Sequence, residues 1–175
     1  MTPDDLRLLI RDVPDFPEPG IDFKDITTLL SHPEGLAASI ELLAQPFLAS
    51  SIDLVVGIEA RGFVFSAPVA LALGAGLVPV RKPGKLPSLT NSVSYALEYG
   101  EGSLEIHADA IPRGARCLIV DDVLATGGTA AAAMELVDAQ GGLVVGLAFL
   151  AELVFLSGRA RVGSDSQVVA LIAYD

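Results

Sequence analysis

The segment that most constrains this chain is 120–130, where an apolar run ends in two acids and a turn of small residues leads into a run of alanines. The apolar residues 117–120 predict a strand buried on both faces, and the alanines after Gly128 predict a helix. A strand, a glycine-rich turn and a helix start in this order leave free backbone amides at the carboxyl end of a sheet. The segment therefore predicts an anion-binding loop on a parallel α/β fold.

The residue types in this loop indicate that its ligand is a phosphate dianion on a sugar. Gly127 and Gly128 allow close approach of the backbone, and two threonines add hydroxyl donors. The loop has no lysine and the chain has no Gly-x-Gly-x-x-Gly turn, so neither a Walker-type ATPase nor a dinucleotide fold is favoured. Asp121 and Asp122 would repel phosphate but could accept hydrogen bonds from a ribose diol. The alternative is that Asp122 caps the helix and Asp121 is a solvated strand end.

Strands and helices alternate along the rest of the chain. Helices are expected from Pro3 until Pro14, over about 34–49, over about 62–73 and after Gly128, and strands at 52–58, about 77–81, about 92–98, about 103–107, 117–120, 143–149 and 168–173. This order predicts an α/β fold with a doubly wound, mainly parallel sheet flanked by helices. We expect a single domain over 1–175, with a small N-terminal hood over about 1–33 and a β-hairpin lid over about 82–100.

Charge and cysteine content limit the partners and the compartment. The chain has 22 acidic and 11 basic residues, and this net charge of −11 disfavours binding to nucleic acid or to an anionic membrane. Arg81, Lys82 and Lys85 are a local exception suited to a polyanionic small substrate. The longest apolar runs are about half the ~20 residues of a membrane span. The single cysteine excludes an internal disulfide, which predicts a cytoplasmic protein.

The acid pair and the loop after it resemble the 5-phosphoribosyl-1-pyrophosphate (PRPP) loop of the type I phosphoribosyltransferase family. Five further segments resemble members of that family that act on adenine, so the resemblance covers nearly the whole chain; they are 16–26, 57–63, 81–87, 95–100 and 152–159. The resemblance implies transfer of the phosphoribosyl group from PRPP to adenine, which gives AMP and pyrophosphate in purine salvage. It also implies a homodimer and Mg²⁺ held by PRPP and water rather than directly by side chains.

The resemblance assigns a role to each candidate site residue. The implied catalytic residues are Glu98, Asp121, Asp122 and Arg61. The implied PRPP- and AMP-binding residues are Asp121, Asp122, Ala125, Thr126, Gly127, Gly128 and Thr129. The implied pyrophosphate-binding residues are Ala60, Arg61, Arg81, Lys82 and Lys85, and the implied adenine-binding residues are Asp22, Phe23, Lys24 and Leu153. In the family, the peptide preceding the pyrophosphate loop is often strained or cis.

Several alternatives stay open at this point. Another base, such as xanthine, hypoxanthine or orotate, could be the acceptor, or the chain could be a regulatory protein that binds PRPP or a nucleotide without turnover. Arg61 could form a surface ion pair, and the basic segment 81–85 could be a solvated edge. Phe23 and Leu153 could be ordinary core residues.

Overall fold

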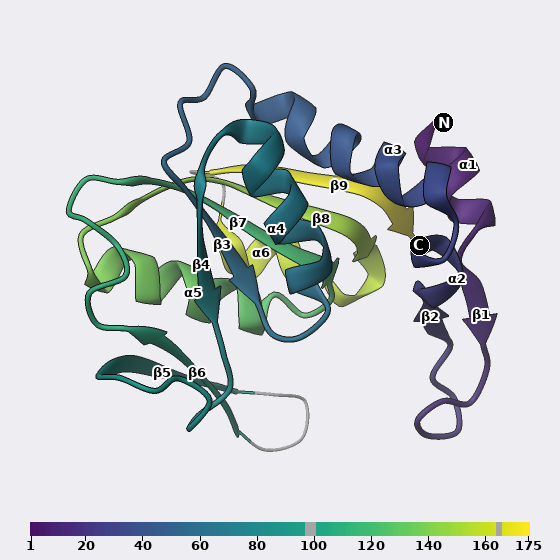
Figure 1. Ribbon diagram of the computed structural model, residues 1–175. Helices are drawn as coiled ribbons and strands as arrows, with labels where there is room; N and C mark the ends of the chain where they lie inside the picture. Colours follow the sequence, from purple (N-terminus) through teal and green to yellow (C-terminus); the bar gives the residue numbers. More distant parts are fainter. Residues whose placement is uncertain (97–100, 164–165) are drawn as a thin grey trace.

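A five-stranded parallel sheet forms the centre of the molecule in the computed structural model, which describes residues 1–96, 101–163 and 166–175 (Figure 1). The strand order is β4-β3-β7-β8-β9. The bounds are Leu54–Ile58 for β3, Gly76–Val80 for β4, Arg116–Leu124 for β7, Leu143–Leu153 for β8 and Gln167–Tyr174 for β9. The predicted doubly wound, parallel α/β fold is therefore confirmed.

Both faces of the sheet are buried, which explains why its central strands are apolar at consecutive positions. On one face, Val55 and Leu118 pack in a cluster with residues of the N-terminal helices. On the other, Val56 and Ile119 pack with Leu136 and with the hairpin. Because successive side chains of a strand point to opposite faces, a strand covered on both sides needs an unbroken apolar run.

Helices α3 and α4 lie on one face of the sheet and α5 lies on the other (Figure 1). The first face carries α1 (Pro3–Leu8), α2 (Thr27–Leu30), α3 (Pro33–Ala44) with the 3₁₀ turn η1 (Gln45–Phe47), and α4 (Gly62–Leu73). The chain after β8 forms η2 (Val154–Leu156) and α6 (Gly158–Val162), and α5 spans Gly128–Ala139. None of the helices in the described ranges has both the length and the apolar character needed to cross a membrane.

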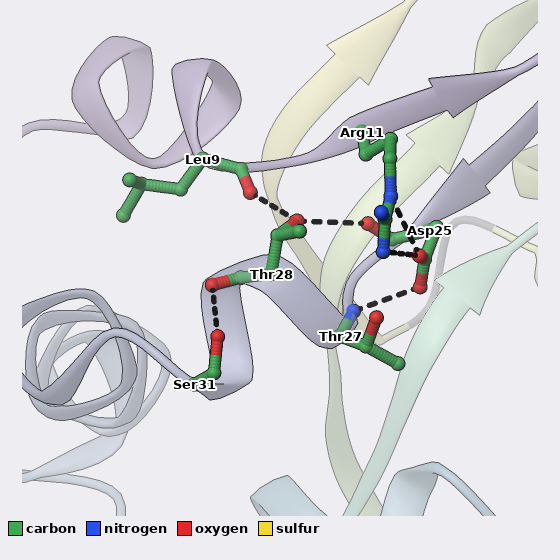
Figure 2. A network of polar contacts seen from close by, with 6 residues as sticks. All are labelled: Leu9, Arg11, Asp25, Thr27, Thr28 and Ser31. Atoms are coloured by element: carbon green, nitrogen blue, oxygen red, sulfur yellow. Dashed lines mark hydrogen bonds and ion pairs between the residues drawn. The ribbon is translucent and has the colours of Figure 1, made fainter.

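The predicted first helix is too long, because the chain turns to a strand well before Pro14. Helix α1 ends at Leu8, and β1 (Arg11–Val13) pairs antiparallel with β2 (Phe23–Asp25). Arg11 donates to Asp25 at 2.7 Å, and the Thr28 hydroxyl donates to the Leu9 carbonyl at 2.6 Å (Figure 2). Hydrogen bonds from Thr27, aided by Arg11, lower the pKa of Asp25 to about 2. Contacts between segments distant in sequence thus override the local helical pattern.

The hairpin packs against α5 on the second face and brings a tyrosine toward the carboxyl edge of the sheet. Its strands are β5 (Thr90–Ala96) and β6 (Glu101–His107), close to the predicted ranges. Tyr95 is opposite Gly102, where a Cβ atom would lie 2.7 Å from the tyrosine ring. The glycine is therefore needed for the ring to lie across its strand neighbour.

Candidate active site

A cavity of about 470 Å³ opens at the carboxyl ends of β3, β7 and β8, and Phe23 and Lys24 of β2 also line it. It is the place where a parallel α/β sheet binds ligands. Eleven of the predicted site residues line it, namely Asp22, Phe23, Lys24, Ala60, Arg61, Lys82, Asp121, Asp122, Ala125, Thr129 and Leu153. These residues come from segments that are up to about 130 positions apart in the chain, so the fold brings together most of the candidate site.

The two acids lie within β7 and not after it, because β7 continues to Leu124 alongside the long strand β8. Asp122 is buried, and Nε of Arg61 lies 2.7 Å from its Oδ2 in an ion pair. Burial, and secondly the charge of Asp122, raise the pKa of Asp121 well above its usual range. The N-cap of α5 is Gly127, so the alternative in which Asp122 caps this helix is wrong.

The turn after the acids forms a small concave site of about 50 Å³ lined by Ala125, Thr126, Gly127, Gly128 and Thr129 with their neighbours. Gly127 has a φ of +77°, and a Cβ atom there would lie 2.4 Å from the carbonyl oxygen of Gly158. No side chain of the described residues caps α5, so its first amides are free to bind an anion. A helix N-terminus with adjacent hydroxyl groups is a suitable cradle for a phosphate dianion.

Arg61 follows β3 in a turn that faces the same acids. The Glu59–Ala60 peptide is cis, as is often so at this position in the family that the sequence resembles. The Arg61 guanidinium carbon also lies 5.3 Å from the centre of the Phe23 ring. Arg61 thus pairs with a buried acid inside the cavity, which argues against an incidental surface ion pair.

The basic segment 81–85 divides into one residue in the cavity and two outside its lining. Lys82 lines the cavity. Arg81 instead forms an ion pair with Glu59, with Nη2 3.0 Å from Oε1, and Lys85 is not among the lining residues. Of these three basic residues, Lys82 alone lines the cavity.

Phe23 and Leu153 form part of the lining of the cavity rather than of the core. Phe16 contacts Phe23 edge-to-face, with 5.2 Å between ring centres. Lys24 lies within 2.8 Å of Asp12 and 2.7 Å of Asp22, and above the Tyr174 ring. Two apolar groups at a cavity wall suit a planar aromatic ring.

Sequence reasoning missed six lining residues, of which Glu59 and Tyr95 carry polar side chains and Ile21, Leu104, Val123 and Ala151 are apolar. Glu59 stands two positions before Arg61 at a strand end, which is a detectable signal. Tyr95 comes within 3.4 Å of the Thr129 hydroxyl only because the hairpin packs over α5, so no local pattern marks it. The predicted catalytic residue Glu98 lies outside the described residues.

Metal ligands are few in the part of the chain described here: no group of three or more His, Cys, Asp or Glu side chains could enclose an ion. The chemistry of the donors nevertheless fits Mg²⁺, which prefers oxygen and is usually bound through few carboxylates together with substrate phosphates and water. Oδ2 of Asp122 is buried and pairs with Nε of Arg61 at 2.7 Å, but it accepts no hydrogen bond of normal geometry from the described residues.

A parallel α/β sheet with an acid pair and a concave glycine-rich loop at its carboxyl edge fits a phosphoribosyltransferase, and the phosphoribosyl transferase domain family matches residues 25–167. The chain is 60% identical over 162 residues to adenine phosphoribosyltransferase of Thermobifida fusca, covering 93% of this chain and 92% of that protein. The chain belongs to the adenine phosphoribosyltransferase family.

Solved structures agree with this assignment. Adenine phosphoribosyltransferase from Thermoanaerobacter pseudethanolicus matches with a TM-score of 0.95 and 50% identity, over 99% of this chain and 100% of that one. The Saccharomyces cerevisiae protein, solved with adenine and an imino-altritol bisphosphate, matches with a TM-score of 0.88 and 42% identity over 97% of both chains.

Proposed function

We propose that this protein transfers the 5-phosphoribosyl group of PRPP to adenine, producing AMP and pyrophosphate in purine salvage. The observation that carries the proposal is the single cavity in which Phe23 and Leu153, the acid pair and Arg61 meet, next to the phosphate cradle of 125–129. The relatives named above are adenine phosphoribosyltransferases, and one was solved with adenine bound.

The acid pair has two tasks in the proposed reaction. Displacement at the anomeric carbon breaks its bond to the pyrophosphate oxygen and forms a bond to adenine, and positive charge develops on the sugar. Asp121 and Asp122 would accept hydrogen bonds from the ribose hydroxyls and stabilise that charge. Asp122 is buried, which strengthens the second effect because charges interact more strongly away from water.

The other proposed roles follow the parts of the ligand. The cradle of Ala125, Thr126, Gly127, Gly128 and Thr129 would hold the 5′-phosphate. The pyrophosphate would be bound by Ala60, Arg61, Arg81, Lys82 and Lys85, and the base would be bounded by Asp22, Phe23, Lys24 and Leu153.

Glu98 would act as the acid or base for the proton on N7 of adenine. Glu98→Gln would therefore slow single-turnover chemistry with little change in PRPP binding.

Mg²⁺ is the proposed cofactor, held by PRPP and water near the acid pair. When bound, it would neutralise charge on the leaving pyrophosphate.

The proposed compartment is the cytoplasm, supported by a single, buried cysteine, and fractionation of the source cells would test it.

The first experiment measures pyrophosphate release from PRPP and Mg²⁺ with adenine, hypoxanthine, guanine, xanthine or orotate offered separately. We expect release with adenine alone, accompanied by AMP, and none when Mg²⁺ is omitted. Turnover with another base instead would contradict the role of Phe23 and Leu153 in adenine selection. PRPP binding without turnover on any base would favour the regulatory alternative.

We also propose a homodimer, for which the exposed apolar side chains on α4 and the edge strand β4 form a suitable surface. Val64 and Leu71 are seven residues apart on α4 and are 39% and 83% exposed, and Leu77 of β4 is 43% exposed. A second copy of the chain would cover these side chains. Sedimentation equilibrium should give about twice 18.1 kDa, and Leu71→Glu should lower that mass, whereas a monomeric wild type would refute the dimer.

A further inference from the structure

The Glu59 carboxylate connects two anion-binding segments that follow neighbouring strands. Its Oε1 lies 3.0 Å from Nη2 of Arg81, and its Oε2 accepts hydrogen bonds from Nε of Arg81 at 3.2 Å and from the Lys82 backbone amide at 3.0 Å. Glu59 follows β3 and Arg81 follows β4, and the last residues of these strands, Ile58 and Val80, are register partners. A bidentate pair of this kind fixes the orientation of both side chains.

Arg81 in turn makes hydrogen bonds that hold the rest of the basic segment in place. Its backbone N–H and carbonyl pair with Glu105, at 2.9 and 2.7 Å, which anchors its Cα to the hairpin. Its Nη1 donates to the Lys85 carbonyl at 3.0 Å. One guanidinium group therefore joins Glu59 at the cavity edge to the turn that contains Lys82.

A carboxylate at this position is unfavourable for a polyanionic ligand by charge alone. Hydrogen bonds from Arg81 and Lys82 lower the pKa of Glu59, so the group is ionised at neutral pH. It lines the cavity, and its side chain is only 14% exposed. A negative charge at this position would weaken the binding of a polyanion, so it needs another role that offsets this effect. The contacts of Glu59 with Arg81 and Lys82 indicate that this role is to hold the basic segment in place.

We infer that Glu59 is a positioning residue for the pyrophosphate group of PRPP, acting through Arg81 and the Lys82 amide rather than by contact with the ligand. The inference rests on the proposed function for the identity of the polyanion. Without the carboxylate, Arg81 loses its bidentate partner and Lys82 loses the acceptor that fixes its backbone. The basic segment then has to be ordered at the cost of binding free energy.

The test is Glu59→Gln, which keeps the size of the side chain and removes its charge. We expect KM for PRPP to rise about 10-fold, in line with loss of hydrogen bonds between charged groups, while kcat and KM for adenine change less than about threefold. Glu135→Gln, at an exposed position on α5, removes the same charge away from the site and should leave KM unchanged. A purely electrostatic role predicts the opposite result, namely tighter PRPP binding in Glu59→Gln.

The second variant is Arg81→Lys, which tests the bidentate contact itself because lysine keeps the positive charge but cannot pair with both carboxylate oxygens of Glu59. If Glu59 acts through Arg81, the double variant should bind PRPP no more weakly than the weaker single variant. Additive defects, an unchanged KM or tighter binding in Glu59→Gln would overturn the inference. Calorimetric binding of PRPP by wild type and Glu59→Gln tests it without turnover, so inactivity of the wild type with adenine would count against the proposed function alone.

Discussion

Asp122→Asn is expected to lower turnover by about 100- to 1,000-fold, the usual effect of removing one group that stabilises charge in a transition state. The substitution keeps the shape of the side chain and removes the negative charge nearest Arg61. KM for PRPP should change less than kcat, because the interaction strengthens as charge develops on the sugar. Single-turnover formation of AMP measures the chemical step directly.

Thermal stability should change little in this variant. Burial and the charge of Asp122 both raise the pKa of Asp121, so removal of that charge makes ionisation of Asp121 less costly in the folded state. This gain opposes the loss of the ion pair to Arg61, whose side chain is 44% exposed and can be solvated by water. Asp138→Asn on the exposed side of α5 is the matched control. A fall in stability comparable with the loss of turnover would make Asp122 a structural residue.

Gly127→Ala is expected to give the largest loss of stability among these variants and to abolish tight PRPP binding. The backbone at Gly127 is left-handed, which costs an alanine about 1–2 kcal/mol. The new methyl group would also collide with the carbonyl oxygen of Gly158, and overpacking of this kind costs about 1–3 kcal/mol more. Together these effects lower the melting temperature by roughly 10 °C in a chain of this length.

Gly114→Ala separates the two contributions. Gly114 has a φ of +79° and no heavy atom within 4 Å of its Cβ position, so only the backbone cost applies there. We expect Gly114→Ala to show the smaller loss of stability and unchanged PRPP affinity in calorimetry. Equal loss of stability in both variants would show that the chain accommodates the methyl group at Gly127 by moving away from Gly158.

The sequence determined the elements whose cause is local. The apolar runs predicted the buried strands, and the starts of α1, α3, α4 and α5 were predicted within about one residue, whereas the ends of α1 and α3 were placed about five residues too late. The order of acids, threonines and glycines in 120–130 predicted the turn and the helix start that form the concave loop proposed to hold phosphate. These features are readable because strand burial, glycine turns and helix starts depend on residues a few positions apart.

The tertiary structure decided which distant groups meet. It paired β1 with β2, extended β7 past the acids by aligning it with β8, and matched Arg61 with Asp122 and Arg81 with Glu59. It also seated Gly158 against Gly127 and Tyr95 against Thr129. No spacing along the chain encodes such contacts, because the free energy that selects each ion pair depends on burial and geometry that exist only once the sheet and its covering layers have formed.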